Sequence, residues 1–460
     1  MSVCFFGVIW TLYKLRTLIM RSKILENIGG VATMKISTIG LGYIGLPTSI
    51  MFAKHGVEVI GVDVKQEVID SLNNGQIHIE EPGLQEALEE VIAKGTFKAS
   101  LQPEKSDAFI VAVPTPNHDD EYKSCDLSYV VSGVKAVLPY VEKGNVIIVE
   151  STIGPRSMDD VVKPLVEEAG LVVGEDIFLV HCPERVLPGQ IMHELIYNNR
   201  IVGGITPACT EAGAKVYSTF VKGEIIKTNA KTAEMSKLME NTFRDVNIAL
   251  ANELAKVCNE LEINALDVID MANKHPRVNL HTPGPGVGGH CLAVDPYFIV
   301  AKAPKTAQLI NLSRTINTSM PHYVVENVNK LMENVDGKVI TVFGLTYKGN
   351  VDDIRESPAM DILEMLKEQQ KYEVRAYDPH VELDWVVTDL KEAVNQSDLI
   401  LVLSDHDEFR QLVHPELAAM RHKRILDTKN VVKAVPVDAE YINYGNLHEF
   451  LSKATASVGK

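Results

Sequence analysis

The sequence predicts an α/β protein with two doubly wound, mostly parallel sheets joined by a long helical segment. Short apolar runs alternate with helical stretches from Met34 onward, and the same alternation resumes near Val339. Between them, residues 231–275 contain neither glycine nor proline and repeat apolar residues at helical spacing, as in one long helix or two abutting ones. The expected order is therefore sheet, helical connector, sheet.

The first sheet is expected from five apolar runs that end in or near polar residues. They are Lys35–Gly40, Val57–Asp63, Asp107–Val113, Asn145–Glu150 and Asp176–His181. The second sheet is expected from residues 338–348, 372–379, 397–405 and 422–430. Ligands of open parallel sheets gather at the carboxyl ends of the strands, so functional residues are expected where these runs end.

Composition is that of an ordinary globular protein. Of 460 residues, 46% are hydrophobic and 23% are charged, which excludes disordered and collagen-like chains. The net charge of −16 argues against a general nucleic-acid or anionic-membrane binder, because repulsion opposes approach. The cysteines lack paired spacing, which predicts free thiols in a reducing, cytoplasmic setting with no metal site; they are Cys4, Cys125, Cys182, Cys209, Cys258 and Cys291.

Residues 1–33 are expected to lie outside the fold. The apolar run Val3–Tyr13 is too short to span a bilayer, and basic residues follow it, whereas a secretory signal begins with them. A membrane-touching helix is one interpretation. A non-native leader is the other, since Met34 opens a natural start and Gly29–Gly30 fits a translated ribosome-binding site.

A glycine-rich turn follows the first predicted strand. Gly40, Gly42 and Gly45 have the G-x-G-x-x-G spacing, and Asp63 ends the next strand. Glycines suit a tight turn and the approach of a pyrophosphate to a helix N-terminus, and the carboxylate suits ribose hydroxyls. A plain strand–helix turn is the alternative. Strand, helix and acid together favour a Rossmann-type dinucleotide site, and Asp63 favours NAD over NADP.

Three polar residues share one face of the predicted connector helix. Lys237, Asn241 and Arg244 fall at positions i, i+4 and i+7, which places an ammonium, an amide and a guanidinium together. A polar stripe of this kind is usually a solvated surface. It becomes a candidate site if it faces a nucleophile.

Cys291 is the candidate nucleophile. It follows the glycine-rich stretch TPGPGVGGH, whose backbone N–H groups, with a nearby cation, are expected to lower the pKa of the thiol and to hold an oxyanion. Asp295 lies four residues further on, within reach of the same pocket. His290 is left without a role, because a lone histidine is more often a packing residue. The other cysteines are interpreted as small apolar fillers.

Eight motifs occur in order from Met34 towards the C-terminus. They are IGLGYIGLPTS, IEEPGL, VPTP, ESTI, CPERVLPG, EMSKLMENTFRDVNIALANEL, GPGVGGHC and RESPAMDIL. Together they resemble the nucleotide-sugar 6-dehydrogenase (UDP-glucose/GDP-mannose dehydrogenase) family. The variants PERVLPG and GVGGHCLAVDP look like its UDP-N-acetyl-D-mannosamine dehydrogenase branch.

The resemblance implies an NAD-binding Rossmann domain at residues 34–228, a helical dimerisation region with the cysteine loop at 229–320, and a UDP-sugar-binding Rossmann-like domain at 321–460. It implies an enzyme that oxidises the C6 alcohol of a UDP sugar to a carboxylate and reduces two NAD⁺, through a thiohemiacetal and a thioester on Cys291. It further implies a homodimer and a role in capsule or cell-surface polysaccharide synthesis.

The resemblance also implies site residues, position by position. The catalytic groups are Cys291 as nucleophile, Lys237 and Asn241 for the oxyanion, Asp295 for proton transfer, and Thr152 and Glu184 for the water. The residues expected to bind NAD are Gly40, Gly42, Tyr43, Ile44, Gly45, Asp63, Pro114, Thr115, Thr152 and Arg355. Those expected to bind the UDP sugar are Glu184, Arg185, Val186, Arg200, Lys237, Asn241, Arg244, Arg277, Gly288 and Lys348. Arg277 reaches across the dimer in some members.

Two departures from the UDP-glucose branch bear on the substrate. Val294 stands where that branch usually has lysine before the aspartate, and Pro188 stands where its second glutamate falls. Both changes agree with an N-acetylated sugar. The alternatives are UDP-glucose, another UDP-N-acetylhexosamine, a single-hydride β-hydroxyacid or 6-phosphogluconate-type dehydrogenase that needs no thiol, and a non-catalytic NAD-binding protein.

Overall fold

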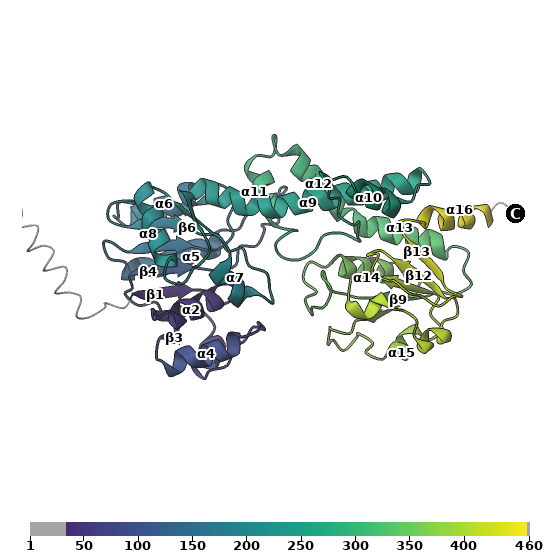
Figure 1. Ribbon diagram of the computed structural model, residues 1–460, viewed down its shortest axis with the longest axis horizontal. Coiled ribbons are helices and arrows are strands. Elements are labelled where there is room, and N and C mark those ends of the chain that lie inside the picture. The colour runs from purple at the N-terminus through teal and green to yellow at the C-terminus, as the bar shows by residue number, and fades with distance from the viewer. Residues whose placement is uncertain (1–33, 458–460) are drawn as a thin grey trace, which may run out of the picture. The chain divides into compact units, whose positions relative to one another are not determined.

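The computed structural model describes residues 34–457, which divide into two compact units (Figure 1). Unit 1 runs through Pro114 and takes in Tyr129–Ser151 and Met158–Ala230, and unit 2 comprises Thr115–Ser128, Thr152–Ser157 and the chain from Lys231 onward. The predicted α/β class is confirmed. The expectation for residues 1–33 lies outside the described residues, among which no helix is long and apolar enough to cross a membrane. The three-part domain division stays a prediction.

Unit 1 contains an eight-stranded sheet in the order β3-β2-β1-β4-β5-β6-β7-β8. The strands are β1 (Lys35–Ile39), β2 (Glu58–Val62), β3 (Phe97–Ser100), β4 (Ala108–Val111), β5 (Val146–Val149), β6 (Phe178–His181), β7 (Arg200–Gly204) and β8 (Ile225–Asn229). The order of the first six is that of dinucleotide-binding sheets. All five predicted strands are present. The sequence prediction missed β3, β7 and β8, because none of these strands has more than two apolar residues in a row.

One strand departs from the expected parallel arrangement. β7 pairs with β6 in the antiparallel sense, with His181 opposite Gly203 and Val180 opposite Gly204. The other neighbouring pairs are parallel. Because β7 runs against β6, it begins at the edge of the sheet where β5 and β6 end. Its first residue, Arg200, therefore lies at the edge where ligands of such sheets gather.

The helices of unit 1 connect these strands. They are α2 (Gly45–Lys54), α3 (Gln66–Asn73), α4 (Leu84–Ala93), α5 (Ser128–Val137), α6 (Lys163–Glu168), α7 (Ile191–Tyr197) and α8 (Pro207–Tyr217). α2 follows the glycine-rich turn and is buried from Gly45 to Ala53. Its burial fixes the helix N-terminus that a pyrophosphate would meet.

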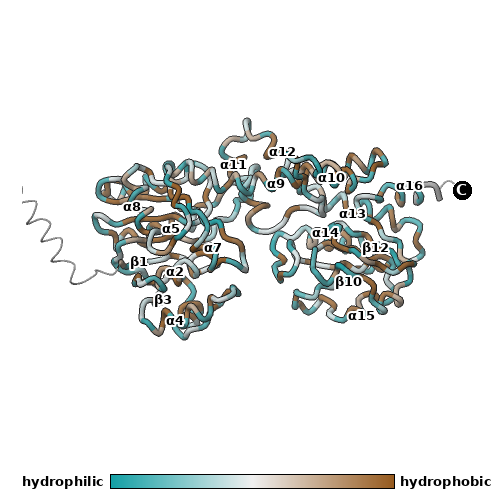
Figure 2. Tube along the Cα trace, in the orientation of Figure 1, coloured by the Kyte–Doolittle hydropathy of each residue, from teal (hydrophilic) through white to brown (hydrophobic). Residues whose placement is uncertain are grey.

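Unit 2 contains a five-stranded parallel sheet in the order β10-β9-β11-β12-β13. The strands are β9 (Val339–Phe343), β10 (Glu373–Tyr377), β11 (Leu399–Val402), β12 (Arg424–Asp427) and β13 (Glu440–Asn443). The strands of both sheets coincide with hydrophobic segments of the chain (Figure 2). The four predicted strands are confirmed. β13 was missed because Ile442 is its one buried residue, too little for an apolar pattern.

The glycine-free stretch forms two helices, α9 (Ala230–Glu260) and α10 (Ala265–Asn273). The chain breaks where Glu262 adopts a φ of 56°. Asn264 then caps α10, because its side chain accepts from the backbone N–H groups of Leu266 and Asp267. The remaining helices are α11 (Asp295–Lys302), α12 (Gln308–Thr318), α13 (Met320–Met332), α14 (Pro358–Glu368), α15 (Leu390–Val394) and α16 (Leu447–Ser457).

A buried polar network ties α9 to the glycine-rich loop. The carboxylate of Asp245 accepts from Arg314 Nη1 at 2.6 Å and from Asn317 Nδ2 at 2.8 Å. Asn317 accepts from Asn252 Nδ2 at 2.9 Å, and Asn252 Oδ1 accepts from the backbone N–H of Gly284 at 2.9 Å. All four side chains are buried. These hydrogen bonds restrict the four side chains to one geometry, so the loop starts from a fixed point on α9.

Candidate active site

The glycine-rich turn between β1 and α2 has the geometry of a dinucleotide site. Gly40 has a φ of +91°, and a Cβ on it would lie 2.5 Å from the carbonyl oxygen of Ala112. A Cβ on Gly45 would lie 1.9 Å from the carbonyl oxygen of Gly40. A Cβ on Gly42 would meet nothing within 4 Å, so this glycine keeps space open on the outer side of the turn. These are the separate glycine roles of a pyrophosphate loop.

Asp63 completes this site at the end of β2. Its carboxylate accepts from the backbone N–H groups of Leu41 and Lys65, each at 3.1 Å. The acid is thereby held beside the turn, where it suits the ribose hydroxyls of NAD. Tyr43 is exposed, and Ile44 occupies the position directly before α2 without a side-chain capping bond. The residues present fit the adenosine half of NAD.

The ends of β4 and β5 carry the next predicted NAD residues. Ser151 Oγ accepts from the backbone N–H of Val113 at 2.9 Å, within unit 1. Pro114 follows at the surface. In unit 2, Thr115 Oγ1 donates to the carbonyl oxygen of Thr152 at 2.6 Å. Each of these bonds fixes one of the turns in which the predicted residues lie.

The polar face of α9 meets the first residue of α11. Lys237 Nζ pairs with Asp295 Oδ2, and Asn241 Nδ2 donates to the same oxygen at 2.6 Å. Arg244 Nη2 donates to Asn241 Oδ1 at 2.5 Å. The predicted common face is confirmed. Two of its three side chains are not solvated, because Lys237 and Asn241 are 7% and 6% exposed, while Arg244 is exposed. We call Lys237, Asn241, Arg244 and Asp295 the lysine cluster.

Cys291 lies in the turn directly before α11. Its backbone carbonyl accepts from the N–H groups of Val294 at 3.1 Å and Asp295 at 2.9 Å. The cysteine is therefore one turn ahead of the carboxylate that holds Lys237. Its side chain is half-buried. The predicted nucleophile and the lysine cluster belong to one locally continuous structure within unit 2.

The glycines of the loop are required by close packing. A Cβ on Gly288 would lie 2.4 Å from the carbonyl oxygen of Glu356 and 2.7 Å from Pro358 Cδ. Gly289 has a φ of +80°, and its Cβ would lie 2.9 Å from the ring of Tyr347. Backbone cannot yield as a flexible side chain does, so Gly288 is the more constrained position. The loop that precedes the thiol is thus pressed against the segment between β9 and α14.

The thiol differs from its sequence expectation in its acidity. Burial raises the pKa of Cys291 above its ordinary value, and Asp295 acts in the same direction. Lys237, Arg244 and Arg355 lower the pKa, but by less than burial raises it. The predicted fall in pKa is therefore wrong, because desolvation of the thiolate outweighs the nearby cations.

The predicted substrate residues of unit 1 lie after β6 and at the start of β7. Arg200 is 4% exposed and pairs with the carboxylates of Glu184 and Glu150. Tyr217 donates to Glu150 Oε1 at 2.5 Å. Arg185 and Val186, which follow Glu184, are half-buried. We call Glu150, Glu184, Arg200 and Tyr217 the arginine cluster; the direct contact of Arg200 with a substrate stays a prediction.

The remaining predicted residues of unit 2 lie nearer the surface. Arg277 and Lys348 are exposed. Arg355 donates from Nε and Nη2 to the two carboxylate oxygens of Asp353, at 2.8 and 2.7 Å. Their contacts with substrate or cofactor stay predictions.

Several residues that shape the site were not singled out from the sequence. Glu150 ends a predicted strand, where functional residues are expected, but no such rule covers Tyr217, which completes the arginine cluster, or Tyr347, which backs the glycine loop. No pattern in the sequence places these side chains together. Asp245 and Asn252 left a signal, since they are polar, seven residues apart and therefore on one helix face.

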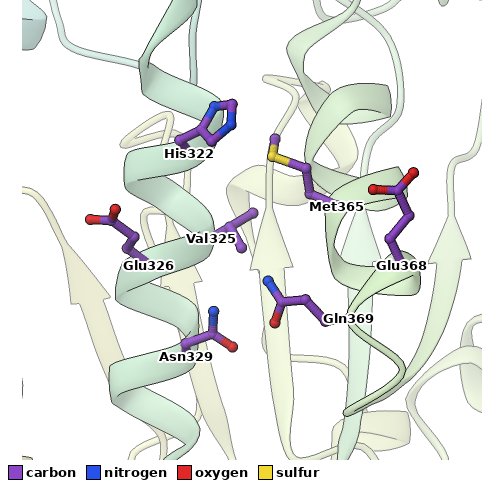
Figure 3. A pocket seen from close by; sticks show the side chains of 7 residues that line it. All are labelled: His322, Val325, Glu326, Asn329, Met365, Glu368 and Gln369. Carbon is purple, nitrogen blue, oxygen red and sulfur yellow. The ribbon is translucent and has the colours of Figure 1, made fainter.

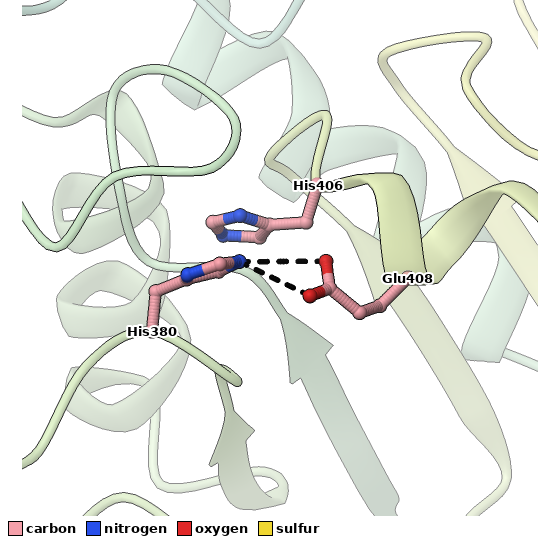
Figure 4. Close-up of side chains that lie close together, drawn as sticks. All are labelled: His380, His406 and Glu408. Carbon is pink, nitrogen blue, oxygen red and sulfur yellow. Dashed lines mark hydrogen bonds and ion pairs between the residues drawn. The ribbon is translucent and has the colours of Figure 1, made fainter. Parts of the chain in front are cut away.

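Three side chains of unit 2 lie as a metal site would require, but their hydrogen bonds oppose it. His380 Nε2 lies 3.3 Å from Glu408 Oε1, beside the stacked ring of His406 (Figure 4). His406 Nδ1 accepts from the backbone N–H of Asn350 at 2.9 Å, and Nε2 lies 3.2 Å from Asp378 Oδ2, which demands a proton there. Neither ring nitrogen of His406 therefore retains a lone pair that could bind a metal ion.

A groove between α13 and α14 is a separate feature of unit 2. Its lining residues are His322, Val325, Glu326, Asn329, Met365, Glu368 and Gln369 (Figure 3). It shares no residue with the predicted site, and the described part of the chain gives no sign of what would occupy it.

Three models of one family match successive parts of the chain. The NAD binding domain of the UDP-glucose/GDP-mannose dehydrogenase family matches residues 34–221, its central domain matches residues 231–319, and its UDP binding domain matches residues 341–434. The chain belongs to the UDP-glucose/GDP-mannose dehydrogenase family. It is an NAD-dependent nucleotide-sugar dehydrogenase, and the family resemblance seen in the motifs is confirmed.

Individual members show the same likeness over nearly the whole chain. A UDP-N-acetyl-D-mannosamine dehydrogenase from Methanococcus vannielii is 46% identical over 407 residues, 86% of this chain and 93% of the relative. An NDP-N-acetyl-D-galactosaminuronic acid dehydrogenase from Ralstonia nicotianae is 42% identical, over 88% of this chain and 97% of the relative. The solved structure of the UDP-N-acetyl-mannosamine dehydrogenase Cap5O from Staphylococcus aureus is 64% identical, has a TM-score of 0.86 and covers 90% of this chain and all of its own.

Proposed function

We propose that this dehydrogenase oxidises UDP-N-acetyl-D-mannosamine to UDP-N-acetyl-D-mannosaminuronate, a four-electron oxidation at C6. The observation that carries the proposal is the lysine cluster directly beside the cysteine turn. Oxidation of one carbon twice needs a nucleophile that retains the aldehyde and donors for the transient oxyanion. Cys291 offers the first, and Lys237 with Asn241 offers the second. The relatives named as UDP-N-acetyl-D-mannosamine dehydrogenases support this choice of substrate.

In this scheme the Cys291 thiolate adds to the C6 aldehyde and forms a thiohemiacetal, which is then oxidised to a thioester. Bound NAD⁺ supplies the hydride acceptor, and two are consumed in each turnover. Lys237 and Asn241 hold the C6 oxygen while it carries negative charge. Asp295 takes part in proton transfer with a bound water. Thr152 and Glu184 orient the water that hydrolyses the thioester.

The resemblance extends the proposal to binding residues. We assign NAD to the turn of Gly40, Gly42 and Gly45 with Asp63. The other residues that we assign to NAD are Tyr43, Ile44, Pro114, Thr115, Thr152 and Arg355. For the UDP sugar we assign those side chains whose exposure suits a ligand contact. They are Arg185, Val186, Arg244, Arg277 and Lys348, with Gly288 supplying backbone.

The direct test is a panel of UDP sugars. The purified protein is incubated with NAD⁺ and, separately, the UDP forms of N-acetylmannosamine, N-acetylglucosamine, N-acetylgalactosamine and glucose, and NADH is followed. We expect the highest kcat/KM for UDP-N-acetylmannosamine, with two NADH formed per sugar. Dominant turnover of UDP-glucose would overturn the choice, and dominant turnover of UDP-N-acetylgalactosamine would favour the activity for which the Ralstonia relative is named.

A matched variant separates this scheme from single-hydride chemistry. Cys291→Ser should abolish net acid formation while NAD binding persists, because no thioester can form. A single-hydride dehydrogenase would be almost unaffected by it. A protein that binds NAD and UDP but reduces NAD⁺ with none of the sugars would be the non-catalytic binder instead.

We propose that two copies of the chain associate through α9. Six apolar side chains of this helix are exposed in unit 2: Met235, Met239, Phe243, Leu250, Val257 and Leu261, the last just beyond its end. They recur at intervals of four and seven residues, so they form one stripe. Phe243→Glu should shift the protein from dimer to monomer in analytical ultracentrifugation, and a wild-type monomer would contradict the proposal.

We also place the enzyme in the cytoplasm, in the supply of uronic acid sugars for capsule or cell-surface polysaccharide. Five cysteines are free thiols in the described part of the chain, as a reducing compartment requires. The polysaccharide role rests on the family resemblance. Loss of N-acetylmannosaminuronate from the surface polymer of a deletion strain would support it, and an unchanged polymer would refute it.

A further inference from the structure

The arginine cluster unites four elements of unit 1. Glu150 follows β5, Glu184 follows β6, Arg200 begins β7 and Tyr217 ends α8. Because β7 is antiparallel to β6, its first residue meets the carboxyl ends of the two preceding strands. Arg200 Nη1 lies 3.2 Å from Glu150 Oε1, and Nη2 pairs with Glu184 Oε2.

The guanidinium of Arg200 makes further contacts with Tyr217 and Cys182. It stacks on the ring of Tyr217 with 4.5 Å between the guanidinium carbon and the ring centroid, and Nη1 lies 3.8 Å from Cys182 Sγ. The Tyr217 hydroxyl donates to the same oxygen of Glu150 that faces Arg200. A buried guanidinium with its fork engaged in this way has one orientation available.

Both carboxylate oxygens of Glu184 accept hydrogen bonds. Oε2 accepts from Arg200, and Oε1 accepts from the backbone N–H of Arg185 at 2.7 Å. The two bonds fix the rotation of the carboxylate as well as its position. An acid that orients a water needs this, because the lone pairs of its oxygens set the direction of the water.

Glu150 lies behind the guanidinium and is fully buried. Burial raises its pKa to about 7, the like charge of Glu184 acts in the same direction, and Arg200 opposes both. The titratable groups that face Glu150 are Arg200 from β7, Glu184 from the β6 end, Cys182 beside it and Tyr217 from α8. Two carboxylates, those of Glu150 and Glu184, thus share the guanidinium of Arg200. Burial favours a proton on the carboxyl group of Glu150.

We propose that Arg200 is a positioning residue that acts through Glu184: it sets the carboxylate that orients the hydrolytic water, with Glu150 and Tyr217 holding the guanidinium from behind. The role differs from the direct substrate contact that the sequence suggested for Arg200. It rests on the proposed function, since it concerns the water step of that scheme. No bond to substrate is required of Arg200 itself.

The test is a double-mutant cycle between Arg200 and Glu184, with NADH release resolved in time. Arg200→Lys keeps the charge but loses the fork, and should slow thioester hydrolysis about tenfold. KM for the UDP sugar and the rate of the first NADH burst should stay within about twofold. In the Glu184→Gln background, Arg200→Lys should cost less than about twofold, because the group it positions is already gone.

Each other outcome counts against the proposal. A tenfold loss that persists unchanged in the Glu184→Gln background means that Arg200 acts independently of Glu184. A rise in KM with unchanged hydrolysis means that it contacts the substrate. NAD affinity and the melting temperature check that the variants are folded.

A milder variant guards against misfolding of the arginine variant. Tyr217→Phe keeps the ring under the guanidinium and removes the hydrogen bond from the hydroxyl to Glu150. It should slow thioester hydrolysis about threefold in the wild-type background and have no effect in the Glu184→Gln background. An equal effect in both backgrounds would contradict the proposal. If the wild-type enzyme shows no burst and hydrolysis phases, the thioester scheme fails, while the coupling of Arg200 to Glu184 is still measured in the steady-state rates.

Discussion

The lysine cluster of unit 2 and the arginine cluster of unit 1 are charge networks with opposite balance. In the lysine cluster, Lys237 and Asn241 bind the single carboxylate of Asp295, and a second cation, Arg244, binds Asn241. In the arginine cluster, two carboxylates share the single guanidinium of Arg200. An excess of cation favours negative charge that develops nearby, whereas an excess of carboxylate favours a retained proton or an oriented base. The difference suits the first cluster to the oxyanion and the second to the water.

Removing the ammonium group of Lys237 should cause the largest loss of activity among changes to the lysine cluster. Lys237→Met leaves Asp295 buried without its ion pair and the oxyanion without a charged donor, so kcat should fall by about a hundredfold to a thousandfold. Lys256→Met is the matched control on the same helix, since Lys256 Nζ donates to Ser319 Oγ and has no part in the site. Steady-state kinetics compare the two. A loss below about threefold for Lys237→Met would show that the cluster does not hold the oxyanion.

Disturbing the glycine loop should affect the lysine cluster and spare the NAD site. A Cβ on Gly288 would lie 2.4 Å from the carbonyl oxygen of Glu356, so Gly288→Ala must shift the loop before Cys291. The expected loss in kcat is about tenfold to a hundredfold, with NAD affinity unchanged. Gly284→Ala is the control, because its Cβ would meet only Lys429 Cδ, at 3.9 Å. Equal losses in both variants would refute the packing argument.

The acidity of Cys291 gives a pH signature of the lysine cluster. The pKa of the thiol lies above its ordinary value of 9.0, so the rate of alkylation should still rise with pH at that point. Lys237 lowers this pKa, and Lys237→Met should therefore move the alkylation profile to still higher pH. Peptide mapping after a limited dose of iodoacetamide measures it. A profile that levels off near neutral pH would contradict the burial effect.

Glu150 gives the arginine cluster a signature on the stability of the fold. Its pKa is raised from 4.5 to about 7 in the folded chain, so its stabilising contribution is full below 4.5 and is lost as pH rises to about 7. Glu150→Gln lacks this titration. The free energy of unfolding of the variant minus that of the wild type should therefore grow over this interval, by about 3 kcal/mol, and then level off. Urea unfolding across that pH range measures the difference, and a constant difference would contradict the raised pKa.

The two clusters also show what the sequence could predict. Lys237, Asn241 and Arg244 share a helix face because helical spacing is a local property, and Asp295 follows Cys291 by one turn for the same reason. The arginine cluster depends on the antiparallel direction of β7, which brings Arg200 to Glu150 and Glu184 across the sheet. β7 has only two apolar residues in a row, Ile201 and Val202, and so short a run gives no pattern from which that direction could be inferred.

The same limit applies to the glycine loop and to the thiol. The glycines were visible in the sequence, but their contact with Glu356 and Pro358 depends on packing between distant segments. The cations near Cys291 were also visible. The net rise in its pKa was not, because burial is a tertiary property that outweighs them.

A trapped adduct shows whether Cys291 carries the substrate through the second oxidation. The Glu184→Gln variant is mixed with NAD⁺ and UDP-N-acetylmannosamine, quenched in acid during the slow hydrolysis phase, and analysed by peptide mass spectrometry. We expect the acylated sugar nucleotide on the peptide that contains Cys291 and on no other. Formation of two NADH per sugar with that peptide unmodified at every time point would contradict it.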